Sequence, residues 1–459
     1  MKKTLAILIA AIMLFTCVGC GEGPIDNSAT TTTNEVDDTT TDNADQTTTS
    51  SSGSVSSKQP AKDPSSTKST GISSTSSTTS KPTRASEFHN VKYRRYGKYI
   101  TVRGGMKNTA YRIVNDLELR VSFMGGSVTA GMGSSRVKGG FRTRLLNFLR
   151  EECPSALFTE TSSTLGGNGS QYGVYITEQM IASKTPDLVF IEYAVNNGYD
   201  GVTSEDKLWN HYETMIHTIR KVNPYADIVL VYVSDRNERS KDIIPILEQI
   251  ADKYQLTSVN LHQVVKDYIS NGGFKWEDYY KNLRGTVDSV HPNDNGYDLM
   301  AEVLFGAVQY GLTTTPYSYA KLPLPAAKGT IQTEAKAIAA TSCTIPTGWE
   351  KAAKFSYGVD LFGGCIQTTE TGKTITVKFK GTHFGVLVDF AKDAGVLEYS
   401  VDGGAYQELN CYLDYSNPKA RMLLENAANT EHTITMRLAS GSRMQIAAYL
   451  MNGTLVSVG

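Results

Sequence analysis

The sequence predicts an α/β domain with a doubly wound, flavodoxin-like parallel sheet, followed by an all-β domain with a jelly-roll-like sandwich. From Leu117 onward, short runs rich in Val, Ile and Leu alternate with segments whose apolar residues repeat at helical spacing. That alternation is typical of βαβ units. Beyond residue 328, short strand-like runs are instead separated by turns of Gly, Asn and Asp, which indicates an all-β domain. We therefore expect the α/β domain at residues 86–312, a linker rich in Pro, Thr and Ala at 313–328, and the β domain at 329–459.

The first twenty residues have the features of an export signal. Two lysines precede an apolar run over residues 5–15, which is shorter than the roughly 20 residues that cross a bilayer. The segment ends in Val18-Gly19-Cys20, which is similar to the end of a bacterial lipobox, whose cysteine receives a diacylglycerol. We expect a signal peptide, lipidation of Cys20 and a location on the extracellular face of the cell membrane. Secretion without a lipid is the alternative.

Residues 21–85 are dominated by Thr, Ser, Asp and Lys, with almost no aromatic or branched aliphatic side chains. Such a segment buries too little apolar surface to fold, so we expect a disordered linker. A coil of about 65 residues spans roughly 40–50 Å end to end. The linker would act as a tether that holds the α/β domain away from a membrane.

Five apolar segments are the predicted strands of the α/β domain: residues 119–124, 157–160, 188–194, 228–233 and 257–261. The third and fourth are nearly all apolar, as expected of central strands that are buried on both faces. Helices are expected between them, and a final helix over about 296–310 closes the domain. The active site of such a sheet lies at the carboxyl ends of its strands.

The first strand runs into Met124-Gly125-Gly126-Ser127-Val128-Thr129-Ala130-Gly131, which places Ser127 at a glycine-lined turn at the carboxyl end of that strand. The sequence does not fit a phosphate-binding loop, a dinucleotide-binding fingerprint or the G-x-S-x-G nucleophile elbow. A turn that presents a nucleophilic serine and a plain tight turn both remain open.

Asp288 and His291 are three residues apart in a loop directly before the last predicted helix. A carboxylate at this spacing can orient an imidazole whose other ring nitrogen faces a serine. A helix-capping loop with a solvated histidine is the alternative. The expected sheet favours the catalytic interpretation, because it brings this loop and the Ser127 turn to the same edge.

Acyl transfer also needs hydrogen-bond donors for an oxyanion. A glycine-rich loop containing Gly167 follows the second predicted strand, and Asn196 follows the third. Gly166 is adjacent to Gly167, and only geometry can choose between the two as the donor. The backbone N–H groups of Ser127 and Gly167, together with the side-chain amide of Asn196, would supply three donors. Taken separately, the glycine is better explained by a turn and the asparagine by a helix cap.

The order Ser127, Gly167, Asn196, Asp288 and His291 on successive loops resembles the four blocks of the SGNH, or GDSL-like, hydrolase superfamily. The resemblance spans about residues 102–312. It is greatest to the branch that reads G-G-S-x-T-x-G, P-D-L-V-F-x-E-x-A-V-N and D-x-x-H-P-N. It implies that Ser127 is the nucleophile, His291 the general base and acid, Asp288 its orienting partner, and Gly167 and Asn196 parts of the oxyanion hole.

Three positions depart from the family pattern. Gly126 replaces the Asp of G-D-S, while Ala194 and Asn197 replace the Gly and the final Asp of G-x-N-D. None of these is the nucleophile, the base or a donor of the oxyanion hole. The departures therefore bear on subfamily and substrate rather than on hydrolysis.

Composition narrows the possible ligands. With 45 Lys and Arg against 46 Asp and Glu, whole-chain charge gives no reason to expect nucleic acid as a partner. Apart from Cys17 and Cys20 in the export signal, no Cys pair stands at zinc spacing, and the histidines are scattered, so no metal and no cofactor is expected. Trp276 and Tyr279 precede the Asp288 loop and are candidates for stacking on a sugar ring, with packing beneath the loop as the alternative.

The resemblance, the tether and the β domain together predict an extracellular serine esterase that removes short acyl groups, such as acetyl, from polysaccharide. Two alternatives remain. One is a carbohydrate-binding or surface-structural lipoprotein whose hydrolase domain is inactive, and the other is a lipase that acts on longer acyl chains.

In the β domain, strands are expected over residues 374–379, 384–390, 396–401, 432–438 and 444–450.

Overall fold

The structure is a computed structural model that describes residues 88–233, 235–353 and 362–459. The expected signal peptide, Cys20 and the Ser/Thr-rich linker at 21–85 lie outside the described residues. Within the described ranges, no helix combines the length and the apolar character that crossing a bilayer requires.

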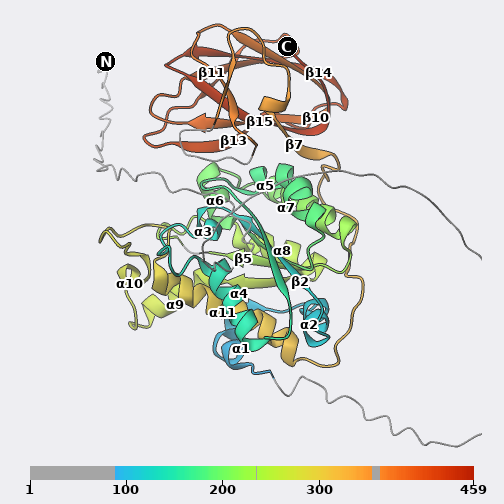
Figure 1. The fold of residues 1–459 in the computed structure, drawn as a ribbon, viewed down its shortest axis with the longest axis vertical. Coiled ribbons are helices and arrows are strands. Elements are labelled where there is room, and N and C mark those ends of the chain that lie inside the picture. The colour runs from blue at the N-terminus through green and yellow to red at the C-terminus, as the bar shows by residue number, and fades with distance from the viewer. Residues whose placement is uncertain (1–87, 234, 354–361) are drawn as a thin grey trace, which may run out of the picture. The chain divides into compact units, whose positions relative to one another are not determined.

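A six-stranded sheet forms the centre of the α/β domain, in the order β1-β6-β5-β4-β2-β3. Figure 1 shows two of its strands, β2 and β5, among the surrounding helices. The strands are β1 Ile100–Thr101, β2 Leu119–Gly125, β3 Phe158–Thr164, β4 Leu188–Glu192, β5 Asp227–Tyr232 and β6 Thr257–Asn260. Strands β2 to β6 pair in parallel, and their order confirms the doubly wound, flavodoxin-like prediction. The short edge strand β1 joins β6 in the antiparallel sense and was not predicted.

Two apolar layers cover the sheet. Alternate side chains of the central strands point to opposite faces, so Phe190 packs in one layer and its neighbours Val189 and Ile191 pack in the other. The first layer is completed by α2, α4, α9 and α11, and the second by α5, α7 and α8. The helices are α1 Val91–Tyr96, η2 Gly97–Tyr99, α2 Lys107–Val114, α3 Ser127–Ala130, α4 Phe141–Glu152, α5 Ser170–Ile176, η3 Thr177–Ile181, η4 Ala182–Lys184, α6 Ala194–Asp200, α7 Glu205–Val222, α8 Ile244–Tyr254, α9 Leu261–Ser270, α10 Trp276–Tyr280 and α11 Asp294–Thr313.

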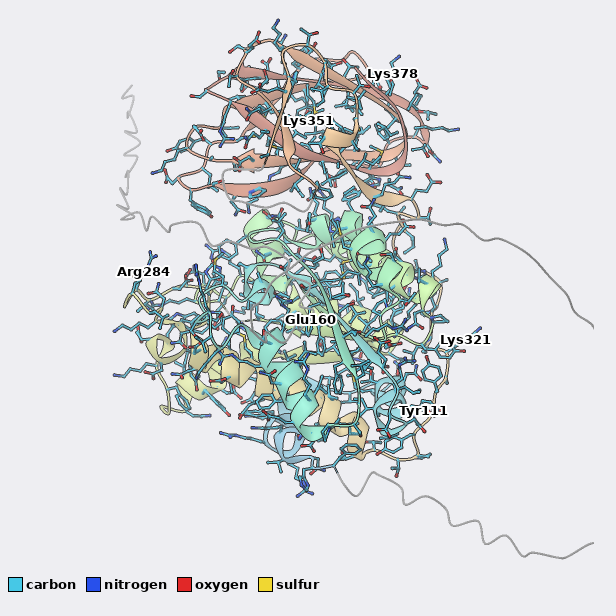
Figure 2. All side chains as sticks on the ribbon, in the orientation of Figure 1. Tyr111, Glu160, Arg284, Lys321, Lys351 and Lys378 are labelled. Atoms are coloured by element: carbon cyan, nitrogen blue, oxygen red, sulfur yellow. The ribbon has the colours of Figure 1, made fainter. Side chains whose placement is uncertain are left out.

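Strand β3 is longer than the sequence predicts. It continues through a run of Thr, Ser and Glu as far as Thr164 and pairs with β2 along its whole length. Because β3 is an edge strand, several of its side chains, including Glu160, are exposed to solvent (Figure 2). Hydrophobic pattern alone detects only the first residues of such a strand. This added length carries the chain to the loop that contains Gly167.

The C-terminal domain is an antiparallel β-sandwich, as predicted. Its elements are β7 Ala335–Ala339, η5 Ala340–Ser342, β8 Glu350–Ala352, β9 Cys365–Thr368, β10 Thr374–Phe390, β11 Val396–Val401, β12 Gln407–Asn410, β13 Asn417–Leu424, β14 Thr430–Ser440 and β15 Met444–Val458. Burial alternates along the first half of β10, where Val377 is buried and Lys378 is exposed (Figure 2). The core of this domain therefore lies between its layers of strands.

Strand β10 is one strand of 17 residues where the sequence predicts two. Its first half pairs with β14 and its second half with β13, and its pairing with β15 shifts register between Gly381 and His383. A Cβ on Gly381 would lie 2.2 Å from the carbonyl oxygen of Asn452, so only glycine fits this crossing. Gly381, which falls in the gap between the two predicted strands, therefore lies at a bulge within one continuous strand.

The predicted linker contains no regular element between the end of α11 and the start of β7. It is nevertheless bound to the α/β domain. The N–H of Leu322 donates to the carbonyl of Pro224 at 2.8 Å, and the N–H of Lys328 donates to Glu213 Oε1 at 2.9 Å.

Candidate active site

Ser127 lies at the turn between β2 and α3. Strand β2 ends at Gly125, and Ser127 begins the short helix α3. As the first residue of the helix, Ser127 has a backbone N–H without an intrahelical partner. The residue is 7% exposed, so its hydroxyl lies at the carboxyl end of the sheet but is largely covered by neighbouring residues.

His291 links Ser127 to Asp288. The Nε2 atom of His291 lies 2.8 Å from Ser127 Oγ, and its Nδ1 atom lies 3.0 Å from Asp288 Oδ2. The structure therefore brings together three side chains that are up to 164 residues apart in sequence. The chain of contacts is that of a Ser-His-Asp triad, with the imidazole between a hydroxyl and a carboxylate.

The second carboxylate oxygen of Asp288 accepts hydrogen bonds from backbone N–H groups of the same loop. Asp288 Oδ1 accepts the N–H groups of Val290 at 2.8 Å and His291 at 2.9 Å. Burial alone raises the pKa of Asp288, but the hydrogen bond and charge of His291 and the two backbone donors outweigh it and lower the pKa to about 2. Asp288 is thus a carboxylate throughout the neutral range.

Aromatic side chains support this loop from below. The indole N–H of Trp276 donates to the carbonyl of Asp288 at 2.7 Å, and its ring stacks on Tyr280 with centroids 3.7 Å apart. Tyr279 is 5% exposed and belongs to the apolar core. For Tyr279, this burial favours packing beneath the loop over stacking on a sugar.

Asn196, near the start of α6, lies directly against the nucleophile turn. A Cβ on Gly126 would lie 2.1 Å from Asn196 Oδ1, so the amide occupies the space that a larger residue 126 would take. Asn196 is 5% exposed. The glycine in place of the family's Asp therefore has a local reason, since it lets the amide approach the peptide before Ser127.

The loop between β3 and α5 brings two glycines to the site. A Cβ on Gly166 would lie 3.6 Å from the Cβ of Ser127, while Gly167 has φ of +68° and faces Asn417 and Lys419 of β13. Within the described part of the chain, neither glycine's backbone N–H donates a hydrogen bond. Both N–H groups are therefore available to a ligand at this edge.

Glu192 is a site residue that the sequence did not single out. It is the last residue of β4, is fully buried, and accepts a hydrogen bond from the hydroxyl of Thr129 at 2.8 Å. Burial raises its pKa to about 7, with a partial offset from the Thr129 hydroxyl and the backbone of Gly126 and Thr129. Its position at the end of an apolar run resembles that of a core residue, which explains why pattern analysis missed it.

Asn197 connects the helices beside the site. Its Oδ1 atom accepts the N–H of Ser170 at 2.7 Å and the Ser170 hydroxyl at 3.0 Å, and that hydroxyl lies 2.9 Å from His211 Nδ1. Burial, with the nearby charges of Lys207 and His383, lowers the pKa of His211 to about 3. His211 is thus a neutral structural residue. Among the described residues, no group of three or more His, Cys, Asp or Glu side chains is placed to hold a metal ion.

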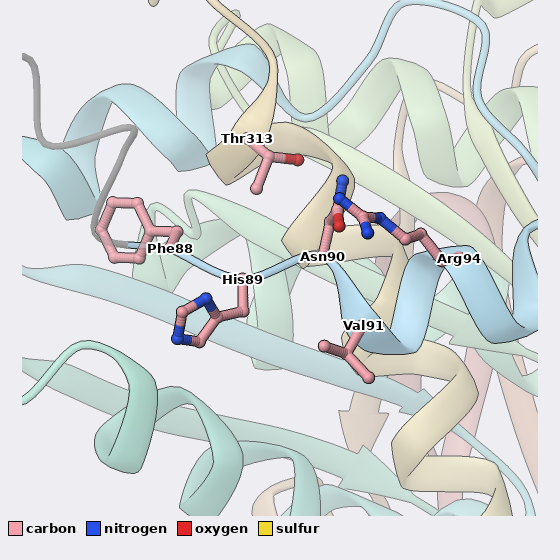
Figure 3. A pocket seen from close by; sticks show the side chains of 6 residues that line it. All are labelled: Phe88, His89, Asn90, Val91, Arg94 and Thr313. Carbon is pink, nitrogen blue, oxygen red and sulfur yellow. The ribbon is translucent and has the colours of Figure 1, made fainter.

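Two hollows mark the surface of the α/β domain. One of about 150 Å³ adjoins the His291 loop and is lined by Gly133, Ser135, Lys281, Leu283, Asn293, Asp294 and Asn295. The other, of about 300 Å³, lies where the start of α1 meets the end of α11 and contains none of the predicted site residues (Figure 3). Of these two hollows, the first is the one close to the triad.

Comparison with known proteins gives a family match that spans Ser127 to His291 and solved structures with the same fold. Residues 123–299 match the model of the GDSL-like lipase/acylhydrolase family. Among curated proteins, none matches the sequence. The solved structures that share the fold include a two-domain esterase active on acetylated mannans, with 22% identity, a TM-score of 0.67 and coverage of 79% of this chain and 99% of that one. The same esterase co-crystallised with mannopentaose gives a TM-score of 0.66 at 22% identity, covering 79% and 98%.

Proposed function

We propose that this chain, whose residues 123–299 form a GDSL-like lipase/acylhydrolase domain, is a serine esterase that removes short acyl groups from polysaccharide. The observation that carries the proposal is the continuous contact from Ser127 Oγ through His291 to Asp288, at 2.8 and 3.0 Å. These distances are those at which an imidazole transfers a proton.

The proposed reaction is a double displacement. Ser127 Oγ attacks the ester carbonyl while His291 Nε2 takes the hydroxyl proton, and the negative charge of Asp288 stabilises the imidazolium that forms. The tetrahedral oxyanion accepts hydrogen bonds from the N–H groups of Ser127 and Gly167 and the amide of Asn196. His291 then returns the proton to the departing alcohol. Water, activated by the same imidazole, cleaves the acyl-enzyme and releases the acid.

The lining of the hollow beside His291 supports a polar substrate. It contains the side chains of Lys281, Asp294 and two asparagines, with Leu283 as its large apolar residue. A long acyl chain needs an extended apolar channel, whereas amide and charged groups suit the hydroxyls of a sugar. This lining favours a short acyl group on a glycan over the alternative of a lipase.

Exposed aromatic rings near the site offer further contacts for a sugar. Tyr412 and Tyr415 are 54% and 62% exposed, and both lie on the loop that precedes Asn417 of β13. Because Asn417 contacts Gly167, this loop lies close to the expected acyl site. The fold is shared with an esterase active on acetylated mannans, so acetylated mannan is the first substrate to test.

The decisive experiment measures acetate release from a panel of acetylated glycans by the protein and its Ser127→Ala variant. The proposal predicts release from at least one glycan by the unaltered protein and a loss of about a thousandfold or more in the variant. Equal rates for the two proteins on every glycan and on p-nitrophenyl acetate would instead favour a binding protein with an inactive hydrolase domain.

We also propose that the enzyme acts outside the cytoplasm, tethered by a lipid on Cys20 and the linker at 21–85. The lipobox-like end of the N-terminal segment supports this. Metabolic labelling with a fatty acid tests it: the protein is expected to take up label, and a Cys20→Ala variant is expected to take up none. Equal labelling of both proteins would contradict the anchor.

A further inference from the structure

The loop that carries Gly167 is bound by a strand of the other domain. Strand β13 of the β-sandwich lies against residues 165–169, which are about 250 residues away in sequence. A Cβ on Gly167 would lie 2.2 Å from the side-chain amide of Asn417 and 3.0 Å from Lys419 Nζ. We call residues 165–169 the Gly167 loop.

Asn168 attaches this loop to the backbone of β13. Its Nδ2 atom donates to the carbonyl of Pro418 at 2.7 Å, and its Oδ1 atom accepts the N–H of Ala420 at 2.8 Å. The side chain is 1% exposed, so these bonds do not compete with water. The amide thus pairs with β13 as a neighbouring strand would.

Lys419 holds the next peptide group. Its ammonium donates to the carbonyl of Gly167 and also lies 3.3 Å from Asp200 Oδ1. Asp200 Oδ2 in turn accepts the N–H of Gly169 at 3.0 Å. The side chains of Lys419 and Asp200 are only 12% and 7% exposed. A buried lysine with a single carboxylate partner and a bond to a loop carbonyl fixes that loop strongly.

These bonds fix the direction of the Gly167 N–H. In a trans peptide the C=O and the following N–H point in opposite directions, so binding a carbonyl also aims the N–H of the next residue. The carbonyl of Gly166 accepts Asn168 Nδ2 at 3.0 Å, and the carbonyl of Gly167 accepts Lys419. Asn168 therefore aims the Gly167 N–H directly, because it binds the carbonyl of the same peptide group, while Lys419 fixes the peptide group that follows Gly167 and so limits rotation of the loop beside that N–H. Glycine accommodates the φ of +68° that this arrangement requires.

We propose that Lys419 and Asn168 are positioning residues for catalysis, through which the β-sandwich holds the Gly167 N–H where the oxyanion forms. The proposal rests on the esterase function argued above. Under this proposal the C-terminal domain is part of the active site, whether or not that domain also contacts the substrate. A donor displaced by about 1 Å contributes little to the transition state, and such misplacement lowers the rate by about a hundredfold.

The test replaces Lys419 with Met, whose unbranched side chain is one atom shorter and lacks the charge and the donors. Lys207→Met is the matched control, because Lys207 forms another salt bridge to the β-sandwich, with Glu425 at 2.8 Å, and does not contact the Gly167 loop. We expect Lys419→Met to lower kcat on p-nitrophenyl acetate by about ten- to a hundredfold with KM within about twofold. Lys207→Met should leave both constants within about twofold.

A third variant, Lys419→Arg, separates positioning from general weakening of the fold. Arginine retains the charge and the donors, so it should recover at least part of the lost kcat, whereas loss of packing would not be rescued in this way. Thermal unfolding of all three variants shows whether Lys419→Met still folds.

If the unaltered protein hydrolyses the ester through Ser127 and Lys419→Met retains its kcat, the positioning role is overturned while the proposed function stands. The positioning role is also overturned if Lys207→Met loses as much kcat as Lys419→Met, or if Lys419→Arg recovers none. Absence of Ser127-dependent turnover in the unaltered protein overturns the proposed function, and the inference with it.

Discussion

The buried carboxyl of Glu192 makes the stability of the α/β domain depend on pH in a way that one substitution should remove. Glu192 is fully buried beneath the Ser127 turn, and its pKa is raised from 4.5 to about 7 by that burial. Between these two pH values the folded state retains a proton that the unfolded chain has released. The free energy of unfolding therefore falls as pH rises through this window, and the penalty is complete above pH 7.

The size of the effect follows from the same two values. Raising a carboxyl pKa from 4.5 to about 7 corresponds to roughly 3 kcal/mol. Glu192→Gln keeps the shape and the acceptor for Thr129 but has no proton to lose. We expect the variant to have about the same stability as the unaltered protein at pH 4.5 and to be more stable by up to about 3 kcal/mol at pH 8.

Urea unfolding followed by circular dichroism at pH 4.5, 6 and 8 measures this difference. Glu151→Gln is the control, because Glu151 is exposed on α4, and a substitution there should add the same small increment at every pH. A stability difference for Glu192→Gln that does not change between pH 4.5 and 8 would refute the reasoning.

Four further substitutions test the site through kcat on p-nitrophenyl acetate. Gly126→Ala places a methyl group 2.1 Å from Asn196 Oδ1 and should lower kcat by about tenfold or more, while Gly273→Ala, whose nearest neighbour would be 4.0 Å away, should have no effect. Asn196→Ala removes an oxyanion donor and should cost about a hundred- to a thousandfold. Asp288→Asn leaves His291 without its carboxylate and should lower kcat by about a thousandfold or more. Trp276→Phe loses the bond to the Asp288 carbonyl and should lower kcat by about two- to tenfold on this small ester.

Each of these expectations has a contrary outcome. A Gly126→Ala variant with normal kcat would show that the Asn196 amide is free to move, and unchanged kcat in Asn196→Ala would remove it from the oxyanion hole. Normal turnover by Asp288→Asn would mean that the imidazole is oriented by something else. If Trp276→Phe raises KM for a glycan and leaves the small ester unaffected, Trp276 contacts sugar and does not act through Asp288.

The parts of the fold that sequence predicts are those with a local signature. The apolar runs of β4 and β5 identify the central strands, and turn residues after strand ends indicate the loops with Ser127, Gly167 and Asn196. A parallel sheet brings such loops to one edge, so the approach of Ser127 to His291 is foreseeable although the two are 164 residues apart.

The features that sequence does not predict depend on contacts between distant segments. The bonds of Asn168 and Lys419 join segments that are about 250 residues apart and belong to two domains. Neither residue is part of a sequence pattern from which its partner could be predicted. Strand β3 continues through polar residues because β2 supplies its hydrogen bonds. Gly381 lies between two strands that were predicted as separate. Pairing with β15, where Gly381 closely approaches Asn452, instead keeps β10 continuous.

The central claim is that the Ser127 hydroxyl is the nucleophile, activated by His291 at 2.8 Å. Labelling with a fluorophosphonate, followed by peptide mass spectrometry, tests it most directly, because this reagent forms a covalent bond only with an activated hydroxyl. The account predicts one adduct, on Ser127, which disappears together with esterase activity in His291→Ala. Labelling at another residue, or undiminished labelling of Ser127 in His291→Ala, would contradict it.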